Sequence, residues 1–320
     1  MSACPPHRIG IIGLGRMGQN HLRVLSTLAG AQVVFVADAD PAKAEEVANS
    51  HGVAAAGDID RAMGGCDAVI IASPTITHED YIRRAARHVR HIFVEKPLTS
   101  DRTSSESIRD LVKADGLNLQ VGFIERFNPA VEQVKALLDR STEVVSVDFV
   151  RTNKLSSRIT DVDVITDLMI HDIDLALHLN GPVCAVSAHG VASGPMIDFA
   201  SALLTHANGR FSRIQASRIT DQKMRRIQAT CRDMFVDCEL LRKEITISRQ
   251  SEVEQRPGEP YRITALTEAV EVLPREALLL ELQAFVRSMS GEETPGRPTA
   301  DEGLAAMVIC DEVQGAILGA

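Results

Sequence analysis

The chain has 320 residues, of which 45% are hydrophobic and 24% charged, enough to fill the cores of one large or two ordinary domains. Its net charge of −9 argues against a diffuse nucleic-acid-binding surface, because neutralising phosphates requires a basic face. No stretch approaches the roughly 20 apolar residues of a membrane span, and the N-terminal residues lack the apolar stretch of a signal peptide. We therefore expect a cytoplasmic protein with no nucleic-acid partner and no membrane attachment.

The first third of the chain alternates short apolar runs with stretches of helical periodicity. The expected strands are 8–12, 31–37, 67–72, 91–95 and 118–121, and the expected helices are 16–28, 41–50, 79–88 and 103–114. Continuous apolar strands separated by helices are typical of a parallel sheet covered on both faces. Residues 1–121 are therefore predicted to form a doubly wound α/β domain.

Beyond residue 121, apolar and polar residues alternate in the manner of half-exposed strands. Such runs occur at 143–152 and within 183–189, 197–207, 210–219 and 225–238, while helices are expected at 164–179, 275–289 and 299–318. Residues 122–320 are predicted to form an α+β domain with a large, mostly antiparallel sheet, whose C-terminal helix can return to the first domain. The sheet's uncovered face needs a partner, so we expect a homo-oligomer.

A Gly-rich turn, Gly13-Leu14-Gly15-Arg16-Met17-Gly18, connects the first predicted strand to the first predicted helix. In that context its spacing predicts a dinucleotide pyrophosphate at the helix N-terminus. Asp38 ends the second strand, where its carboxylate can accept hydrogen bonds from a ribose diol and repel a 2′-phosphate. This favours NAD over NADP, although Arg16 could neutralise such a phosphate. Asp38 could instead cap the helix that begins near Pro41.

Two further strand ends supply candidate contacts to the cofactor. Ser73, Pro74 and His78 follow the strand at 67–72, and loops at the carboxyl ends of parallel strands line the ligand crevice. For His78, a place on the first turn of the next helix is an equal alternative. Glu95-Lys96-Pro97 closes the strand at 91–95 and predicts a lysine beside the nicotinamide ring. The alternative is a surface lysine that merely ends a strand.

Together, the Gly-rich turn, the Ser73-Pro74 to His78 segment, Glu95-Lys96-Pro97, Gly122-Phe123 and Arg126-Phe127-Asn128-Pro129 resemble the glucose–fructose oxidoreductase/inositol dehydrogenase family. The resemblance covers nearly the whole chain. It implies a Rossmann domain and an α/β domain that forms dimers or tetramers through its open sheet. It also implies NAD(P)-dependent oxidation of a pyranose or cyclitol, with cofactor contacts from Glu95 and Lys96 and substrate contacts from Lys96, Arg126 and Asn128. In this family the Lys–Pro bond is often cis.

Residues 158–174 are most similar to the UDP-N-acetylglucosamine 3-dehydrogenases of the family. That similarity implies a UDP-sugar substrate and a 3-keto product, from which a 2,3-diamino sugar for lipid A is built. Arg151 and Arg158, together with Lys154, could clamp a diphosphate, although a solvated loop explains them equally well. An inositol or free-sugar dehydrogenase and a non-catalytic dinucleotide-sensing regulator are the alternative functions.

Oxidising a secondary alcohol requires a base for the hydroxyl proton and an acceptor for the hydride. Lys96 and His171 are the candidates for proton transfer, and we expect both to contact the substrate. On a regular helix Asp167 and His171 are four residues apart and share one face, so Asp167 or Asp174 can orient the imidazole. A satisfied interior histidine is the alternative. Hydride transfer needs no metal, and we expect none.

Overall fold

The computed structural model describes residues 5–154, 162–194, 196–249, 253–254, 262–263 and 266–319. The chain divides into two compact units: Met1–Phe127 with Glu276–Val308, and Asn128–Arg275 with Ile309–Ala320. The sequence placed the boundary after residue 121. The first unit continues to Phe127 and also takes back residues 276–308.

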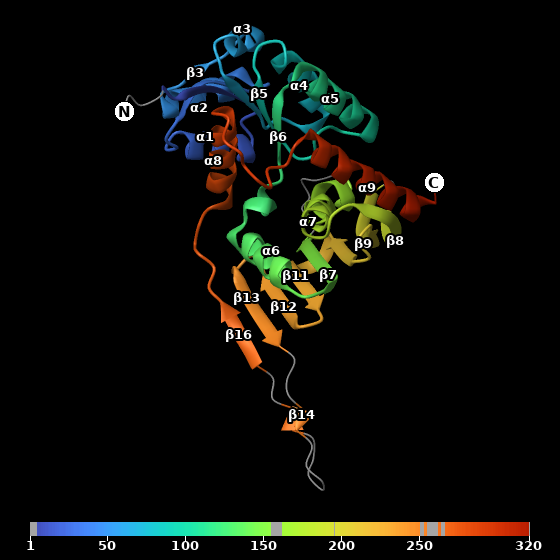
Figure 1. Ribbon diagram of the computed structural model, residues 1–320. Coiled ribbons are helices and arrows are strands. Elements are labelled where there is room, and N and C mark those ends of the chain that lie inside the picture. The colour runs from blue at the N-terminus through green and yellow to red at the C-terminus, as the bar shows by residue number, and fades with distance from the viewer. Residues whose placement is uncertain are drawn as a thin grey trace. The chain divides into compact units, whose positions relative to one another are not determined.

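The first unit is built on a six-stranded parallel sheet in the order β3-β2-β1-β4-β5-β6 (Figure 1). Its strands are β1 His7–Ile12, β2 Ala31–Ala37, β3 Ala54–Ala55, β4 Ala68–Ile71, β5 His91–Glu95 and β6 Asn118–Gly122. The predicted doubly wound sheet is confirmed. Strand order reverses between β1 and β4, and ligands of such sheets bind outside the carboxyl ends of the strands at that point.

Helices cover both faces of this sheet. They are α1 Arg16–Leu25, α2 Pro41–His51, α3 Ile59–Met63, α4 His78–Ala85, α5 Arg102–Asp115 and α8 Ala277–Met289. Helices α1, α2 and α8 share one apolar core with Ile70 and Phe93, whose side chains point to the same side of the sheet. Helix α4 contacts β4, β5 and α5, and its buried Ile82 lies outside that core, on the opposite face.

The second unit contains an eight-stranded sheet in the order β16-β13-β12-β11-β7-β10-β9-β8. Its strands are β7 Val144–Lys154, β8 Val183–Ser193, β9 Met196–His206, β10 Phe211–Ser217, β11 Ile219–Cys231, β12 Met234–Glu239, β13 Glu244–Arg249 and β16 Leu266–Val270; a separate pair joins β14 Val253–Glu254 and β15 Arg262–Ile263. Only β7 and β10 run parallel among these neighbours, so the expected mostly antiparallel sheet is confirmed. The predicted run 225–238 is divided between two strands by a bend at residues 232–233.

Helices α6, Pro129–Arg140, and α7, Ile170–Asn180, pack on one face of this sheet (Figure 1). The helix expected over 164–179 begins instead as a π-helical turn, η3 Ile165–Met169, which continues into α7. The C-terminal helix is α9 Ala300–Leu318. Within the described residues, every helix is too short or too polar to cross a membrane.

Candidate functional site

The Gly-rich turn between β1 and α1 needs its glycines for distinct physical reasons. Gly13 has φ +92°, and a Cβ there would lie 2.5 Å from the backbone nitrogen of Ser73. A Cβ on Gly18 would lie 1.8 Å from the carbonyl oxygen of Gly13, so only glycine allows α1 to approach the turn this closely. A Cβ on Gly15 would meet no atom within 4 Å. The turn is therefore packed on the protein side and open at Gly15.

Asp38 lies directly beside this turn, one residue after β2. The Leu14 N–H donates to its Oδ2 at 2.7 Å, the Asp40 N–H donates to its Oδ1 at 3.1 Å, and Lys43 Nζ lies 3.3 Å from Oδ2. Desolvation pushes the pKa of Asp38 upward, but the two backbone donors and Lys43 outweigh it, so its pKa lies below the ordinary value. Asp38 is therefore ionised and held in place at neutral pH.

The alternative role of Asp38 as a helix cap does not hold, because Asp40 caps α2. Asp40 Oδ1 accepts hydrogen bonds from the backbone N–H groups of Ala42 and Lys43. Asp38 is left facing the turn. An open backbone at Gly15, the N-terminus of α1 and an ionised Asp38 fit a dinucleotide with its pyrophosphate at the turn and a ribose diol at Asp38. Arg16 is exposed beside the turn, and Met17 is half-buried.

Glu95, the first residue of the strand-end tripeptide, is held from α1. His21 Nε2 lies 2.7 Å from Glu95 Oε1, the His21 ring is fully buried, and its edge packs on Phe93. His21 Nδ1 makes no hydrogen bond to any described residue. A proton on Nδ1 would be an unsatisfied buried donor, so the tautomer with its proton on Nε2, facing Glu95, is favoured. Sequence reasoning missed His21, whose position on the apolar side of α1 indicates burial but not its partner.

Lys96 is half-buried at the carboxyl end of β5, and the Lys96–Pro97 peptide bond is cis, as the family resemblance implied. The Pro97 carbonyl oxygen lies 2.9 Å from Nδ1 of His78, and His78 Nε2 lies 3.0 Å from the Ser73 carbonyl oxygen. The His78 ring is buried, with 1% exposed, so it reaches backbone in both directions and presents no surface to a cofactor. Burial is the main cause that lowers the pKa of His78.

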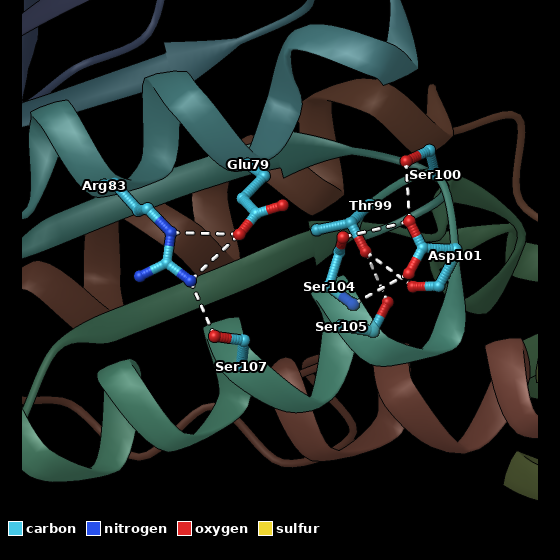
Figure 2. Close-up of polar contacts among 8 residues, drawn as sticks. All are labelled: Glu79, Arg83, Thr99, Ser100, Asp101, Ser104, Ser105 and Ser107. Carbon is cyan, nitrogen blue, oxygen red and sulfur yellow. Dashed lines mark hydrogen bonds and ion pairs between the residues drawn. The ribbon is translucent and has the colours of Figure 1, made fainter.

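The segment that follows Pro97 is hydrogen-bonded to the start of α5, and Figure 2 shows these contacts from Thr99 onward. Thr99 is fully buried, and its hydroxyl contacts the Asp101 carbonyl at 3.0 Å and the Ser105 hydroxyl at 2.6 Å. Asp101 caps α5: its Oδ1 accepts a hydrogen bond from the backbone N–H of Ser104, and its Oδ2 accepts from the hydroxyls of Ser104 and Ser100. The backbone that follows Lys96 is therefore fixed by local hydrogen bonds.

In the second unit, the start of α7 is held by a buried ion pair. Arg151 on β7 donates twice to Asp172, through Nε at 2.7 Å and Nη2 at 2.8 Å. Their side chains are only 2% and 4% exposed. Asp172 directly follows His171, which is half-buried. Arg151, expected from sequence to bind a diphosphate, thus engages a carboxylate inside the protein and positions the residue next to His171.

The π-helical turn before α7 has its own anchors. Asp163 Oδ1 accepts the backbone N–H groups of Ile165 and Thr166, each at 3.0 Å. Arg218, 4% exposed, donates from Nη2 to the Asp163 carbonyl at 2.8 Å and lies 3.4 Å from Asp167 Oδ2. Asp167 lies in a wider, π-helical turn, so the α-helical spacing expected between it and His171 does not hold. Arg218 was not foreseen, since it lies 51 residues from Asp167 in the sequence.

Three further residues predicted for the substrate site, Arg126, Asn128 and Lys154, contact other residues of the protein. Arg126 is buried and donates to the Gly296 carbonyl at 3.4 Å, with Glu302 at 3.9 Å. Asn128 caps α6 by accepting the Ala130 N–H. Lys154 pairs with Asp221 at the surface. Arg158 lies outside the described residues. Among the residues that the structure describes, no group of three His, Cys, Asp or Glu side chains could hold a metal.

A doubly wound sheet with this turn and an ionised acid after β2 defines a dinucleotide-binding domain of the type that binds NAD. A family model described as an oxidoreductase family with an NAD-binding Rossmann fold, GFO/IDH/MocA, matches residues 7–123, and the model of the GFO/IDH/MocA C-terminal domain matches residues 134–234. The chain is 30% identical to the UDP-N-acetylglucosamine 3-dehydrogenase of Acidithiobacillus ferrooxidans, over 93% of this chain and 92% of the relative. The protein belongs to the GFO/IDH/MocA oxidoreductase family and is an NAD-dependent dehydrogenase.

Similarity extends to a second substrate group within the family. The inositol 2-dehydrogenase of Rhizobium meliloti is 31% identical over 95% of this chain and 94% of its own. Among solved structures, the Acidithiobacillus ferrooxidans UDP-N-acetylglucosamine 3-dehydrogenase superposes with a TM-score of 0.88 at 27% identity, covering 99% of both chains. Sequence identity alone therefore does not separate a sugar nucleotide from an inositol.

Proposed function

We propose that the protein oxidises the 3-hydroxyl of UDP-N-acetylglucosamine, with NAD as hydride acceptor, to a 3-keto sugar nucleotide. The observation that carries this proposal is the similarity over 99% of both chains to a structure named for that activity. The 3-keto product would serve a transamination step toward a 2,3-diamino sugar, as the sequence resemblance implies.

The proposal assigns the chemistry to three side chains. When bound, NAD supplies the hydride acceptor. Lys96 takes the hydroxyl proton or positions the hydroxyl, and the loop that follows it is fixed by His78 and by the α5 cap. His171 is the second group for proton transfer, and Asp167 orients it or the sugar. The anchors of α7, Arg151 on Asp172 and Arg218 at Asp163, hold the start of this helix in place.

An initial-rate screen of NADH formation tests the substrate. With equal concentrations of UDP-N-acetylglucosamine, UDP-glucose, N-acetylglucosamine 1-phosphate and free N-acetylglucosamine, we expect turnover with the first compound only. UDP alone should inhibit competitively. Turnover with free sugars that UDP does not inhibit at millimolar concentration would reject the sugar-nucleotide assignment and leave the dehydrogenase assignment intact.

The second candidate is an inositol dehydrogenase, which the 31% identity to the Rhizobium meliloti enzyme favours. It requires no diphosphate contact, and Arg151, one of the residues expected to supply one, is engaged with Asp172. Adding myo-inositol and scyllo-inositol to the same screen decides between the candidates. Faster turnover with either inositol than with UDP-N-acetylglucosamine would establish the second.

We also propose that the uncovered face of the eight-stranded sheet forms a homo-oligomer contact, as a dimer or tetramer. Phe211 on β10 and Phe235 on β12 lie in one cross-strand row, joined through Ser146 and Thr230, and are 41% and 37% exposed. Leu203, 43% exposed, lies in the next row opposite Arg213. Exposed aromatic and aliphatic side chains gathered on one sheet face are typical of interaction sites.

A further inference from the structure

Two buried histidines flank the lysine to which the proposed function assigns proton transfer. His21 holds the Glu95 side chain from α1, and His78 contacts the Pro97 carbonyl from the first turn of α4. Lys96 is the single residue between these two held neighbours. The side chain of the residue before Lys96 and the carbonyl of the residue after it are therefore each held by a buried imidazole ring, 0% and 1% exposed.

His78 also joins two loops that both lie at the carboxyl edge of the parallel sheet. One ring nitrogen faces Ser73 O, in the loop that follows β4, and the other faces Pro97 O, in the loop that follows β5. The β4 loop is itself packed against the Gly-rich turn, since a Cβ on Gly13 would lie 2.5 Å from Ser73 N. A chain of contacts thus runs from the dinucleotide turn through Ser73 and His78 to the backbone beside Lys96.

We propose that His78 is a positioning residue for Lys96, which couples the placement of the lysine to the β4 loop of the cofactor crevice. The inference rests on the proposed role of Lys96. His78 touches neither cofactor nor substrate in this account, because its ring is enclosed by protein. Its effect is transmitted through one peptide unit, from the Pro97 carbonyl to the Lys96 backbone.

The protonation state of the ring limits how many of the two carbonyls it can donate to at one time. Burial, together with the positive end of the α4 dipole, favours the neutral imidazole, and burial lowers the pKa of His78 against the opposing effects of both carbonyls and Glu95. A neutral ring has one N–H and donates to one carbonyl at a time. Donation to Pro97 fixes Lys96 directly, whereas donation to Ser73 fixes only the neighbouring loop.

Contacts between α4 and α5 hold the helix that carries His78 in place. Next to it on α4, Glu79 pairs with Arg83, and Arg83 donates to Ser107 on α5 at 2.6 Å (Figure 2). Helix α5 in turn is capped by Asp101, four residues after Pro97. The ring therefore projects from a helix that is tied to the far end of the same loop, and the loop cannot shift as a whole without breaking these contacts.

Two substitutions separate the contacts. In His78→Asn the amide nitrogen can take the place of Nδ1 and keep donation to Pro97, whereas in His78→Gln it can take the place of Nε2 and keep donation to Ser73. We expect His78→Gln to lose about tenfold to 10²-fold in kcat, because a misplacement of about 1 Å is worth up to about 10²-fold, and His78→Asn to retain most of the activity. In His78→Gln the KM for NAD should change far less than kcat.

A matched control comes from the second unit. His206 is equally buried, with Nδ1 2.7 Å from the Gly181 carbonyl and Nε2 2.8 Å from the Ser212 hydroxyl. His206→Asn removes a comparable structural contact far along the chain from Lys96. It should lower the thermal midpoint without the loss of kcat, which distinguishes positioning from general destabilisation.

The second readout does not depend on turnover. Competitive acetylation, followed by mass spectrometry across pH, reports the reactivity and apparent pKa of the Lys96 amine in each variant. We expect the Lys96 titration to shift in His78→Gln and to stay unchanged in His206→Asn. In addition, His78→Gln should cause no further loss when combined with Lys96→Ala, since residues acting as a unit are non-additive.

These outcomes keep the two proposals apart. If Lys96→Ala retains turnover, the proposed role of Lys96 fails, whatever the His78 variants do. If Lys96→Ala is inactive but His78→Gln equals His78→Asn and His206→Asn in kcat and in Lys96 titration, the positioning role of His78 is overturned. Multiplicative losses in the double variant would overturn it as well.

Discussion

The buried pair between Arg151 and Asp172 offers the sharpest test of how α7 is held. Replacing Arg151 with Met leaves the Asp172 carboxylate, 4% exposed, without its bidentate partner. Removing one member of a buried ion pair costs about 3–5 kcal/mol, because the remaining charge stays desolvated. We expect Arg151→Met and Asp172→Leu each to lose stability of that order. The double variant should recover to within about 1 kcal/mol of the wild type, since an apolar pair of similar volume replaces the charges.

The assay is urea unfolding of the wild type, both single variants and the double variant. The two compact units can unfold separately, so the transition must be followed with a probe on the second unit, such as hydrogen exchange along α7. A loss below about 1 kcal/mol for Arg151→Met, or a double variant no more stable than the singles, would refute the reasoning.

The same double variant separates the structural role of Arg151 from a substrate role. If Arg151 serves only to hold Asp172 and the adjacent His171, the stable double variant should keep its KM for UDP-N-acetylglucosamine and its inhibition by UDP. If the guanidinium also binds a diphosphate, KM should rise by about tenfold or more while stability is restored, since charge-assisted bonds to phosphate contribute about 1.5–3 kcal/mol.

Four further predictions follow from named contacts. Asp38→Ala should lower the preference for NAD over NADP in kcat/KM, because the carboxylate that repels a 2′-phosphate is lost while Lys43 remains; an unchanged ratio would count against the role of Asp38. Lys96→Ala and His171→Ala should each lower kcat by about 10²-fold or more, and near-normal turnover in either would reject that residue. Because the pKa of His78 is lowered in the folded protein from an unfolded value of about 6.5, its neutral ring contributes stability above that pH, and this contribution is lost as pH falls below it. Between pH 7.5 and 5.5 the thermal midpoint should therefore fall less steeply in His78→Asn than in the wild type. Parallel slopes for the two proteins would contradict this. Phe211→Arg together with Phe235→Arg should shift the sedimenting species to a smaller one, and an unchanged species would exclude that face as the contact.

The doubly wound domain was predictable because its strands are continuous apolar runs. In addition, close contacts between atoms enforce the spacing of the glycines in its turn. Gly18 illustrates this, since any side chain there would collide with Gly13. The cap of α2 was less predictable, because Asp38 and Asp40 both precede the helix and only the local backbone geometry selects Asp40. Strands β13 and β16 were missed; β16 is mostly exposed, and pairing with its neighbour rather than its own sequence pattern defines it.

The candidate site likewise combines residues that the sequence predicted with contacts that it did not predict. Lys96 and Asp38 were predictable because each comes directly after a strand, and the apolar runs in the sequence locate the ends of these strands well. Contacts such as Arg151 with Asp172, 21 residues apart, depend on how a strand and a helix pack. Residues 164–179 read as one regular helix, yet a π-helical turn forms where Asp163 accepts two backbone N–H groups. Arg218 binds the Asp163 carbonyl from a distant strand connection, and no local pattern indicates that contact.

The most direct test of the central claim is the fate of the hydrogen on the sugar's third carbon. Under single-turnover conditions with stoichiometric NAD, UDP-N-acetylglucosamine carrying deuterium at C3 should yield deuterated NADH, detected by mass spectrometry. The same sugar nucleotide deuterated at C4 should yield unlabelled NADH. Deuterium transfer from C4, or no NADH from either compound while an inositol is oxidised, would contradict the proposed function.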